Sequence, residues 1–176
     1  ELQVDKNKIV VSGDSAGGWF TNSCLVLDKE LHHIAYAYEF YSGFMMDFPQ
    51  YDGVDTMDIF EAIDKHKIYA KNRVDRIRYA GVMDYYLHGK IDAHDPVVCI
   101  TSCPDLSWLP DMTVVCGEYD WLRLSNDAFV KRVRAEGVNI RNLRYLGCDH
   151  GFMEKVGVLP QAEEVLLDLA DVLKNL

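Results

Sequence analysis

Short runs of β-branched and aromatic residues alternate with longer stretches of helical periodicity along this chain. Apolar runs without polar alternation are typical of parallel strands that are buried on both faces. They predict strands over residues 8–12, 34–41, 113–117 and 140–146. Helical patterns predict helices over residues 16–29, 124–136 and 160–176. This order of elements predicts an α/β fold in which a mostly parallel sheet carries helices on both faces.

The alternation is interrupted by a long insertion over residues 44–111. Inside it we expect helices over 57–70 and 74–87 and a proline-containing loop over 89–110. Long insertions between strands often form lids or binding loops. We therefore expect a single domain over 1–176, with 44–111 as a helical lid that covers the functional site. Some residues of the insertion are candidates either for lining an acyl pocket or for packing the lid's own core: Phe44, Met45, Met46, Phe48, Tyr51 and Phe60.

Composition and charge exclude some classes of function. Apolar residues make up 49% of the 176 residues and charged residues 26%, which is typical of a globular protein. The 18 Lys and Arg against 28 Asp and Glu give a net charge of −10. A nucleic-acid binder needs a cationic surface to displace counterions from phosphates, so this charge argues against that class. It also disfavours docking on anionic lipid, but it is compatible with a small neutral or apolar substrate.

The sequence also favours a cytoplasmic location. No apolar run approaches the length of a membrane span, and the chain opens at Glu1 without the basic and apolar regions of a signal peptide. The cysteine count of five is odd, and Cys24, Cys116 and Cys148 lie in apolar stretches that are typical of a core, so we expect these three to be buried and the thiols to be reduced. Cys99 and Cys103 lack a second pair at metal-ligand spacing, and no metal or cofactor is expected.

The segment Gly13-Asp14-Ser15-Ala16-Gly17 fits the pattern GxSxG between an expected strand and an expected helix. In this context the serine lies on a tight turn that exposes its hydroxyl. Ser15 is therefore the candidate nucleophile. The amide of Ala16, at the start of the helix, is the candidate oxyanion donor. The alternative is a purely structural turn, or one that binds phosphate.

A serine nucleophile needs a base, and the base needs an orienting acid. Asp120 follows the expected third strand and His150 follows the fourth, so both lie on the same rim of the sheet as Ser15. Glu118 and Asp149 remain alternatives for the acid. For the other histidines, a surface or structural role is the more natural interpretation: His32, His33, His66, His88 and His94. The acidic residues around His94 do not have the spacing of a metal-binding motif.

At this point the sequence resembles the hormone-sensitive-lipase-like carboxylesterases of the α/β-hydrolase fold. The resemblance is carried by Gly-Asp-Ser-Ala-Gly-Gly at 13–18, Gly-Glu-Tyr-Asp-Trp-Leu-Arg at 117–123 and His-Gly-Phe at 150–152, supported by Asp-Leu-Ser-Trp-Leu-Pro at 105–110. It implies that Ser15 is the nucleophile, Asp120 the triad acid and His150 the base.

Two departures from the family pattern stand out. Trp121 follows the acid where the family usually has proline. The family also places a His-Gly-Gly-Gly loop, which supplies most of the oxyanion hole, well before the nucleophile, whereas only fourteen residues precede Ser15. We therefore expect the carboxyl-terminal half of such an esterase, with 8–12 as a strand whose free edge pairs with a second copy or with an amino-terminal piece.

These expectations converge on a serine hydrolase that cleaves carboxylic esters of small to medium acyl chains, without cofactor or metal. Two alternatives remain open. One is a serine peptidase or amidase on the same fold, because a triad does not distinguish an ester from an amide. The other is a non-catalytic family member or a catalytically impaired truncated one.

Overall fold

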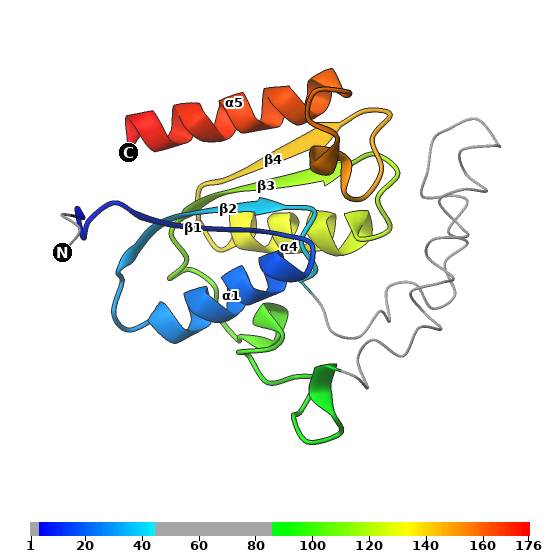
Figure 1. Ribbon diagram of the computed structural model, residues 1–176. Helices are drawn as coiled ribbons and strands as arrows, with labels where there is room; N and C mark the ends of the chain where they lie inside the picture. The colour runs from blue at the N-terminus through cyan, green and yellow to red at the C-terminus, as the bar shows by residue number, and fades with distance from the viewer. Residues whose placement is uncertain (1–3, 45–85) are drawn as a thin grey trace.

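A computed structural model describes residues 4–44 and 86–176. Its centre is a four-stranded sheet, in which β1 (Ile9–Asp14), β2 (Ile34–Phe40), β3 (Asp111–Gly117) and β4 (Ile140–Tyr145) lie in chain order. Every pair of neighbouring strands is parallel. Parallel strands end at the same edge of a sheet, so the loops after β1, β3 and β4 all open on one rim (Figure 1).

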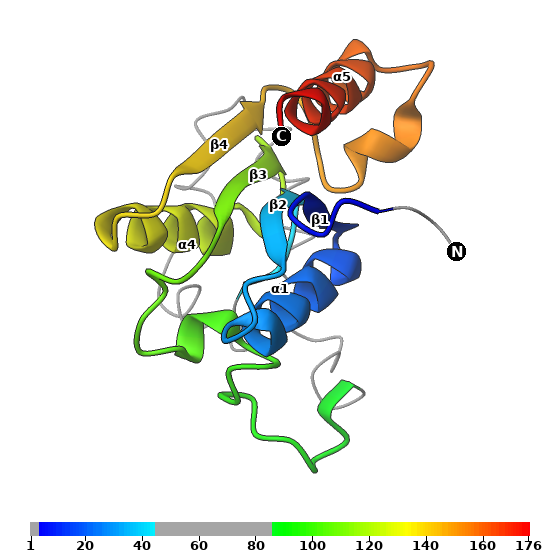
Figure 2. The same cartoon turned by 90° about the vertical axis from the view of Figure 1, so that its left-hand side faces the viewer.

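The helices cover both faces of this sheet (Figure 2). The helices α1 (Ala16–Asp28) and α4 (Arg123–Ala135) lie on one face, and α5 (Pro160–Asn175) lies on the other. Proline stands in the first turn of α5, where it costs no hydrogen bond. The chain leaves α4 through Gly137, whose φ of 89° suits glycine. The α/β class and the parallel sheet with helices on both faces, expected from the sequence, are thus confirmed.

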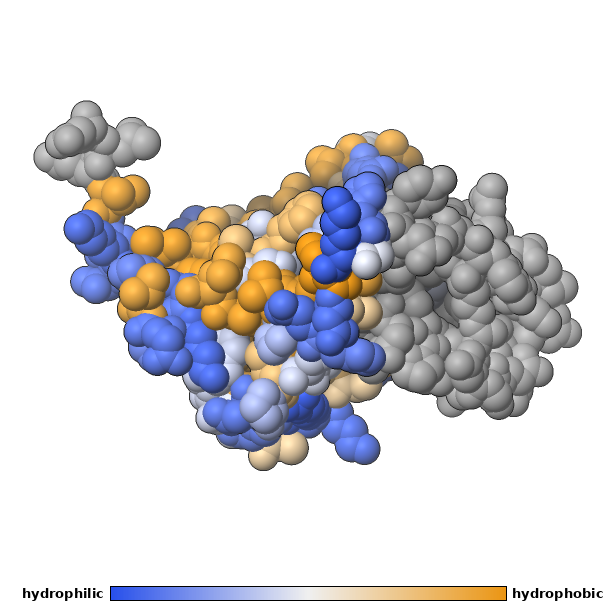
Figure 3. Space-filling view, turned by 90° about the horizontal axis from the view of Figure 1, so that it is seen from below, coloured by the Kyte–Doolittle hydropathy of each residue, from blue (hydrophilic) through white to orange (hydrophobic). Residues whose placement is uncertain are grey.

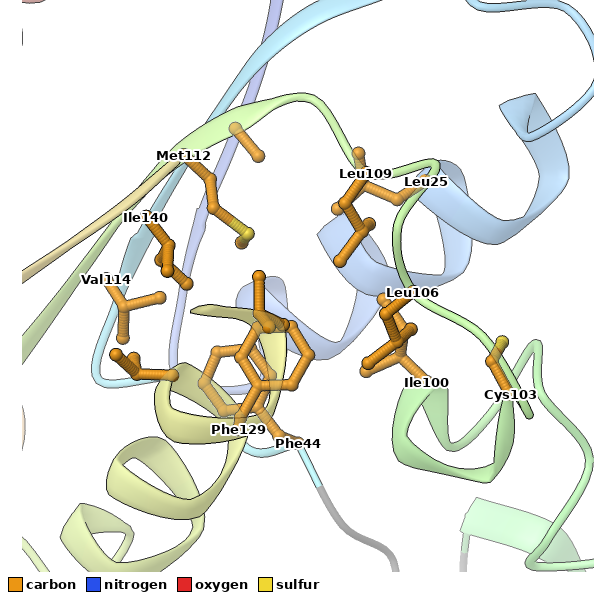
Figure 4. Packing of buried hydrophobic residues seen from close by; sticks show 13 residues of the cluster. Leu25, Phe44, Ile100, Cys103, Leu106, Leu109, Met112, Val114, Phe129 and Ile140 are labelled. Carbon is orange, nitrogen blue, oxygen red and sulfur yellow. The ribbon is translucent and has the colours of Figure 1, made fainter. Parts of the chain in front are cut away.

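The core on the α1 and α4 face contains part of the expected insertion (Figure 4). The ring of Phe44 stacks on Phe129 of α4, with 4.0 Å between ring centroids and 10° between ring planes. Residues 100–109 run along the same cluster, beginning with the short 3-10 helix η2 (Ile100–Ser102). Ile100 and Leu106 are fully buried there. Phe44 therefore packs in the core of the domain, which is a structural role.

Most of the remaining insertion lies outside the described residues. This applies to the expected helix over 57–70, to nearly all of the one over 74–87, and to His66. It applies equally to the other candidates for an acyl pocket: Met45, Met46, Phe48, Tyr51 and Phe60. A lid over the site stays a prediction from the sequence.

The opposite face is rich in aromatic residues. Tyr36, Tyr38 and Phe40 of β2 pack with Val165 of α5 and with Phe152 of the 3-10 helix η3 (Phe152–Lys155). The hydroxyl of Tyr38 donates to Asp168 on α5 over 2.8 Å. These contacts hold η3, and the loop that precedes it, against the carboxyl end of β2.

Two surface features follow from this arrangement. Within the described sheet, β1 has a neighbour on one side only. Hydrophobic side chains also gather on the side of the molecule seen in Figure 3. Phe20 and Leu27 of α1 are exposed, and so is Leu31, which follows this helix. None of the helices in the two described stretches is long and apolar enough to cross a membrane.

Candidate active site

Ser15 occupies the sharp turn between β1 and α1. Its φ of 53° and ψ of −115° lie outside the regions that non-glycine residues usually adopt. The strained backbone is held because the Ser15 amide donates to the carbonyl oxygen of Phe40 over 2.9 Å. A serine held in this way exposes its hydroxyl above the sheet, as in the nucleophile turn of α/β-hydrolases.

The glycines of the motif permit this turn by their lack of a side chain. A Cβ atom on Gly13 would lie 2.2 Å from the carbonyl oxygen of Gly17, and one on Gly18 would lie 1.7 Å from Ser42 Oγ. Gly13 therefore permits the close approach of β1 and α1, and Gly18 permits that of α1 and the loop after β2. A Cβ on Gly17 would meet only Asp14 Oδ1, at an ordinary 3.6 Å.

A continuous chain of hydrogen bonds joins Ser15, His150 and Asp120. Ser15 Oγ lies 2.8 Å from His150 Nε2, and His150 Nδ1 lies 2.9 Å from Asp120 Oδ2. A carboxylate only accepts hydrogen bonds, so Nδ1 carries the proton and donates it to Asp120. Nε2 is then free to accept the hydroxyl proton of Ser15. The residues predicted from the sequence as nucleophile, base and acid are thus brought together in this order.

Asp120 is fully buried in the loop between β3 and α4. Burial raises the pKa of its carboxyl group, and the contact with His150 opposes that rise. Its second oxygen, Oδ1, accepts the amide hydrogen of Leu122 over 2.8 Å. The aspartate is therefore fixed from two sides, and its charge is directed at the imidazole.

The backbone ties the acid loop to the base loop. The amide of Tyr119 donates to the carbonyl oxygen of Cys148 over 2.9 Å. A Cβ on Gly117 would lie 2.7 Å from the same oxygen, so the two loops touch at their bases. Gly151 then turns the chain away with a φ of 74°, directly after His150. The separation of Asp120 and His150 is thus set by main-chain contacts.

The two alternative acids are engaged elsewhere. Glu118 Oε2 accepts the amide hydrogen of Gly147 over 2.8 Å. Asp149 Oδ1 accepts the amide hydrogen of His150 over 2.7 Å. Both carboxylates therefore organise the loop after β4 and leave the imidazole to Asp120.

Aromatic rings enclose His150, a feature that sequence reasoning missed. The ring of Trp121 lies 4.0 Å from the imidazole, and the ring of Tyr41 lies 4.9 Å from it, as centroid distances. The position of Trp121 directly after the acid was visible as a departure from the family pattern. Its contact with His150 was not, because it depends on how the two loops meet.

Ala16 is the first residue of α1, next to Ser15. Amides in the first turn of a helix have no partner within the helix, and the helix dipole favours negative charge there. The Ala16 amide stays the candidate oxyanion donor predicted from the sequence.

Other candidate residues lie away from this centre. His33 Nδ1 is 3.2 Å from Asp28 Oδ1, and His32, His88 and His94 are exposed. All five cysteines are free thiols, but Cys24 is exposed, so the expected burial of Cys24 was wrong. Within residues 4–44 and 86–176, no three His, Cys, Asp or Glu side chains are grouped closely enough to hold a metal ion.

Comparisons with known proteins find relatives of this chain. An arylesterase from Saccharolobus solfataricus is 30% identical over 159 residues, which cover 87% of this chain and 47% of the relative. An esterase from the archaeon Pyrobaculum calidifontis has a similar structure, with a TM-score of 0.72 and 24% identity over 98% of this chain and 54% of that one. A hormone-sensitive lipase from a metagenome library also has a TM-score of 0.72, at 19% identity over 97% of this chain and 55% of that one.

The chain spans about half the length of these relatives. The structural likenesses show a shared fold. A family profile described as the alpha/beta hydrolase fold matches residues 1–154, nearly the whole chain. The chain therefore belongs to the α/β-hydrolase fold family.

Proposed function

We propose that this chain is a serine hydrolase that cleaves carboxylic esters of small to medium acyl chains through Ser15, His150 and Asp120. The observation that carries the proposal is the hydrogen-bond chain from Ser15 Oγ through the His150 imidazole to Asp120, at 2.8 Å and 2.9 Å. The names of the relatives, an arylesterase and an esterase, support an ester as the substrate class.

In the proposed reaction, Ser15 Oγ attacks the ester carbonyl carbon while His150 Nε2 takes the hydroxyl proton. The carbonyl electron pair moves to oxygen, and the Ala16 amide donates to that oxyanion. Collapse of the intermediate breaks the ester C–O bond, and the alcohol leaves with the proton from Nε2. A water molecule repeats the sequence on the acyl-enzyme and releases the carboxylic acid.

The buried Asp120 has two tasks in this scheme. It holds the imidazole in the tautomer that presents a lone pair to Ser15, and it stabilises the imidazolium that forms when the proton arrives. Trp121 and Tyr41 restrict the rotation of the same ring by contact with its faces and edges.

A fluorophosphonate probe and a series of p-nitrophenyl esters of increasing acyl length test this proposal, with Ser15→Ala as the control. We expect covalent labelling of Ser15, turnover that declines with long acyl chains, and neither in the control. An anilide of the best acyl group separates esterase from amidase activity. Absence of both labelling and turnover would reject catalysis by this chain, and labelling that persists in Ser15→Ala would reject the nucleophile.

A further inference from the structure

A buried acid lies beneath the candidate nucleophile, and the proposed reaction does not use it. Glu39 stands on β2, where Gly13 of β1 and Val114 of β3 are its neighbours in register. Its side chain has no exposed surface. Gly13 and Val114 carry no polar side chain, so the residues in register with Glu39 supply neither a cation nor a proton donor to its carboxyl group.

The partner of Glu39 is an amide on the helix that begins at the nucleophile. Asn22 of α1 is equally buried, and its Nδ2 donates to Glu39 Oε2 over 3.4 Å. In the part of the chain that the structure describes, the other two oxygens of this pair, Glu39 Oε1 and Asn22 Oδ1, are buried and without a hydrogen-bond partner. The Ser42 hydroxyl also lies beside Glu39 and lowers its pKa, but the effect of burial is larger. An ionised carboxylate has no hydrogen to donate, so the conflict that remains is at the buried Asn22 Oδ1.

A single proton removes this conflict. A neutral carboxylic acid has one O–H donor, and an amide oxygen is an acceptor. With the proton on Oε1, the acid donates to Asn22 Oδ1 while Asn22 Nδ2 donates to Oε2, so both groups are satisfied in a two-point pair.

We propose that Glu39 is kept as a neutral carboxylic acid, paired with the Asn22 amide through two hydrogen bonds, and that this pair is a positioning element that holds α1 and Ser15 against the sheet. The effect on catalysis rests on the proposed function, whereas the acid–amide pair itself does not.

The contacts around the pair explain how it reaches the site. Asn22 Nδ2 also lies 3.4 Å from the carbonyl oxygen of Gly43, so the same amide ties α1 to the loop after β2. On the other side of that loop, Asn126 of α4 donates to the carbonyl oxygens of Ser42 and Leu122, over 2.8 Å and 2.7 Å. This buried polar layer therefore links the helix after Ser15 to the helix after Asp120.

The titration of Glu39 agrees with the geometry. Burial raises the pKa of Glu39 to about 8, and the neighbouring Ser42 and Asn22 side chains oppose the rise. None of these groups is charged, and the α4 member of the layer, Asn126, does not titrate. Glu39 is therefore neutral at neutral pH and loses its proton in mildly alkaline solution.

The sign of the stability effect follows from linkage. An unfolded glutamate ionises near its model value of 4.5, whereas the folded one ionises near 8. Between these values the folded state binds an extra proton, so raising the pH favours the unfolded state. The contribution of Glu39 to stability is fully present below about pH 4.5 and is lost as the pH rises through about 8.

Glu39→Gln is the matched variant, because glutamine can form the same two-point pair with Asn22 and cannot ionise. Infrared difference spectra of wild type against Glu39→Gln should contain the carbonyl stretch of a protonated carboxylic acid at pH 6.5. The melting temperature of wild type should fall relative to Glu39→Gln between about pH 5 and pH 8 and stay level above that. The rate of fluorophosphonate labelling in wild type, relative to Glu39→Gln, should fall about tenfold between about pH 7 and pH 9, following the protonated fraction.

Glu39→Leu tests the positioning role, because it keeps the volume but loses the pair. We expect slower labelling than in Glu39→Gln at pH 7, and labelling in Glu39→Leu equal to that in Glu39→Gln would overturn the role. If Glu39→Leu does not fold, the Glu39→Gln comparison still decides. Absence of the acid band, together with parallel pH profiles, would overturn the neutral pair. If no variant is labelled at any pH, the proposed function fails, while the infrared and melting measurements still test the pair.

Discussion

The indole ring of Trp121 lies against the imidazole of His150, with ring centroids 4.0 Å apart and ring planes inclined by 33°. Tyr41 contacts the same imidazole from another direction, at 4.9 Å and 60°. The candidate base is therefore held by two aromatic rings as well as by its hydrogen bonds to Ser15 and Asp120. Trp121 takes this role at a position where the family usually has proline.

We predict that Trp121→Ala lowers kcat/KM for p-nitrophenyl esters by about threefold to tenfold, whereas Trp121→Phe retains most of the activity. An aromatic face stabilises the imidazolium that forms in the reaction, and such ring contacts are worth roughly 0.5–1.5 kcal/mol. Steady-state kinetics on both variants checks this. Equal losses in the two variants would show that the aromatic face of residue 121 is not what matters.

Asp120→Asn should abolish most of the activity without unfolding the protein. Asparagine preserves the shape of the side chain but favours the wrong imidazole tautomer, an effect worth roughly 10⁴ in kcat in serine-protease triads. The melting temperature should not fall, because burial raises the pKa of Asp120 and the substitution removes a buried charge. Burst-phase kinetics and thermal unfolding of the same sample give both quantities. A large fall in melting temperature would assign Asp120 a structural role as well.

Two glycines of the nucleophile turn should respond differently to the same substitution. Gly13→Ala places a Cβ 2.2 Å from the main chain of Gly17, and such overpacking costs about 1–3 kcal/mol or more. Gly17→Ala meets only Asp14 Oδ1 at 3.6 Å, and alanine is the better helix former, so its stability should be unchanged or slightly higher. Urea denaturation of the two variants checks the difference. A stable Gly13→Ala would contradict the close approach of strand and helix.

We propose that the free edge of β1 allows two copies of this chain to associate. An unpaired parallel strand presents N–H and C=O groups to any other strand, and lysine on such an edge opposes pairing. The side chain of Ile9 on β1 is 41% exposed, so the substitution Ile9→Lys places a lysine on this edge. Light scattering across a range of concentrations should show dimers of the wild type and monomers of the variant.

Phe20→Lys is the matched control for this edge, because Phe20 is an exposed apolar residue on α1. It should leave the dimer intact. Dissociation of the dimer by both substitutions would point to the apolar surface around α1, and a wild type that stays monomeric at high concentration would refute association.

Much of the fold was predictable because the sequences of buried parallel strands are unbroken runs of apolar residues. The order of the strands then brings residues at their carboxyl ends to one rim, so Ser15, Asp120 and His150 could be nominated together. The start of β3 was missed by two residues, since Asp111 pairs with Tyr36 through its backbone and its polar side chain conceals the strand.

The features that were missed depend on contacts between distant segments. Residues 100–109 have no clear periodicity, and their burial is decided by α1 and α4. An acid on a strand is ordinarily a sign of exposure, yet Glu39 is buried, and its carboxyl group meets Asn22 of α1. Cys24 lies among apolar residues, but the rotation of α1 turns it outward.

The bond between Ser15 and His150 joins residues that are 135 positions apart in the chain. In the described sheet β4 pairs with β3 alone, and the loop that carries His150 follows β4, so this loop reaches Ser15 across the whole sheet. Contacts of such long sequence separation form late and slow the search for the native state. We therefore expect Ser15 to become reactive during refolding only after most of the secondary structure has formed. The rate at which Ser15 can be labelled then reports when β4 joins the sheet.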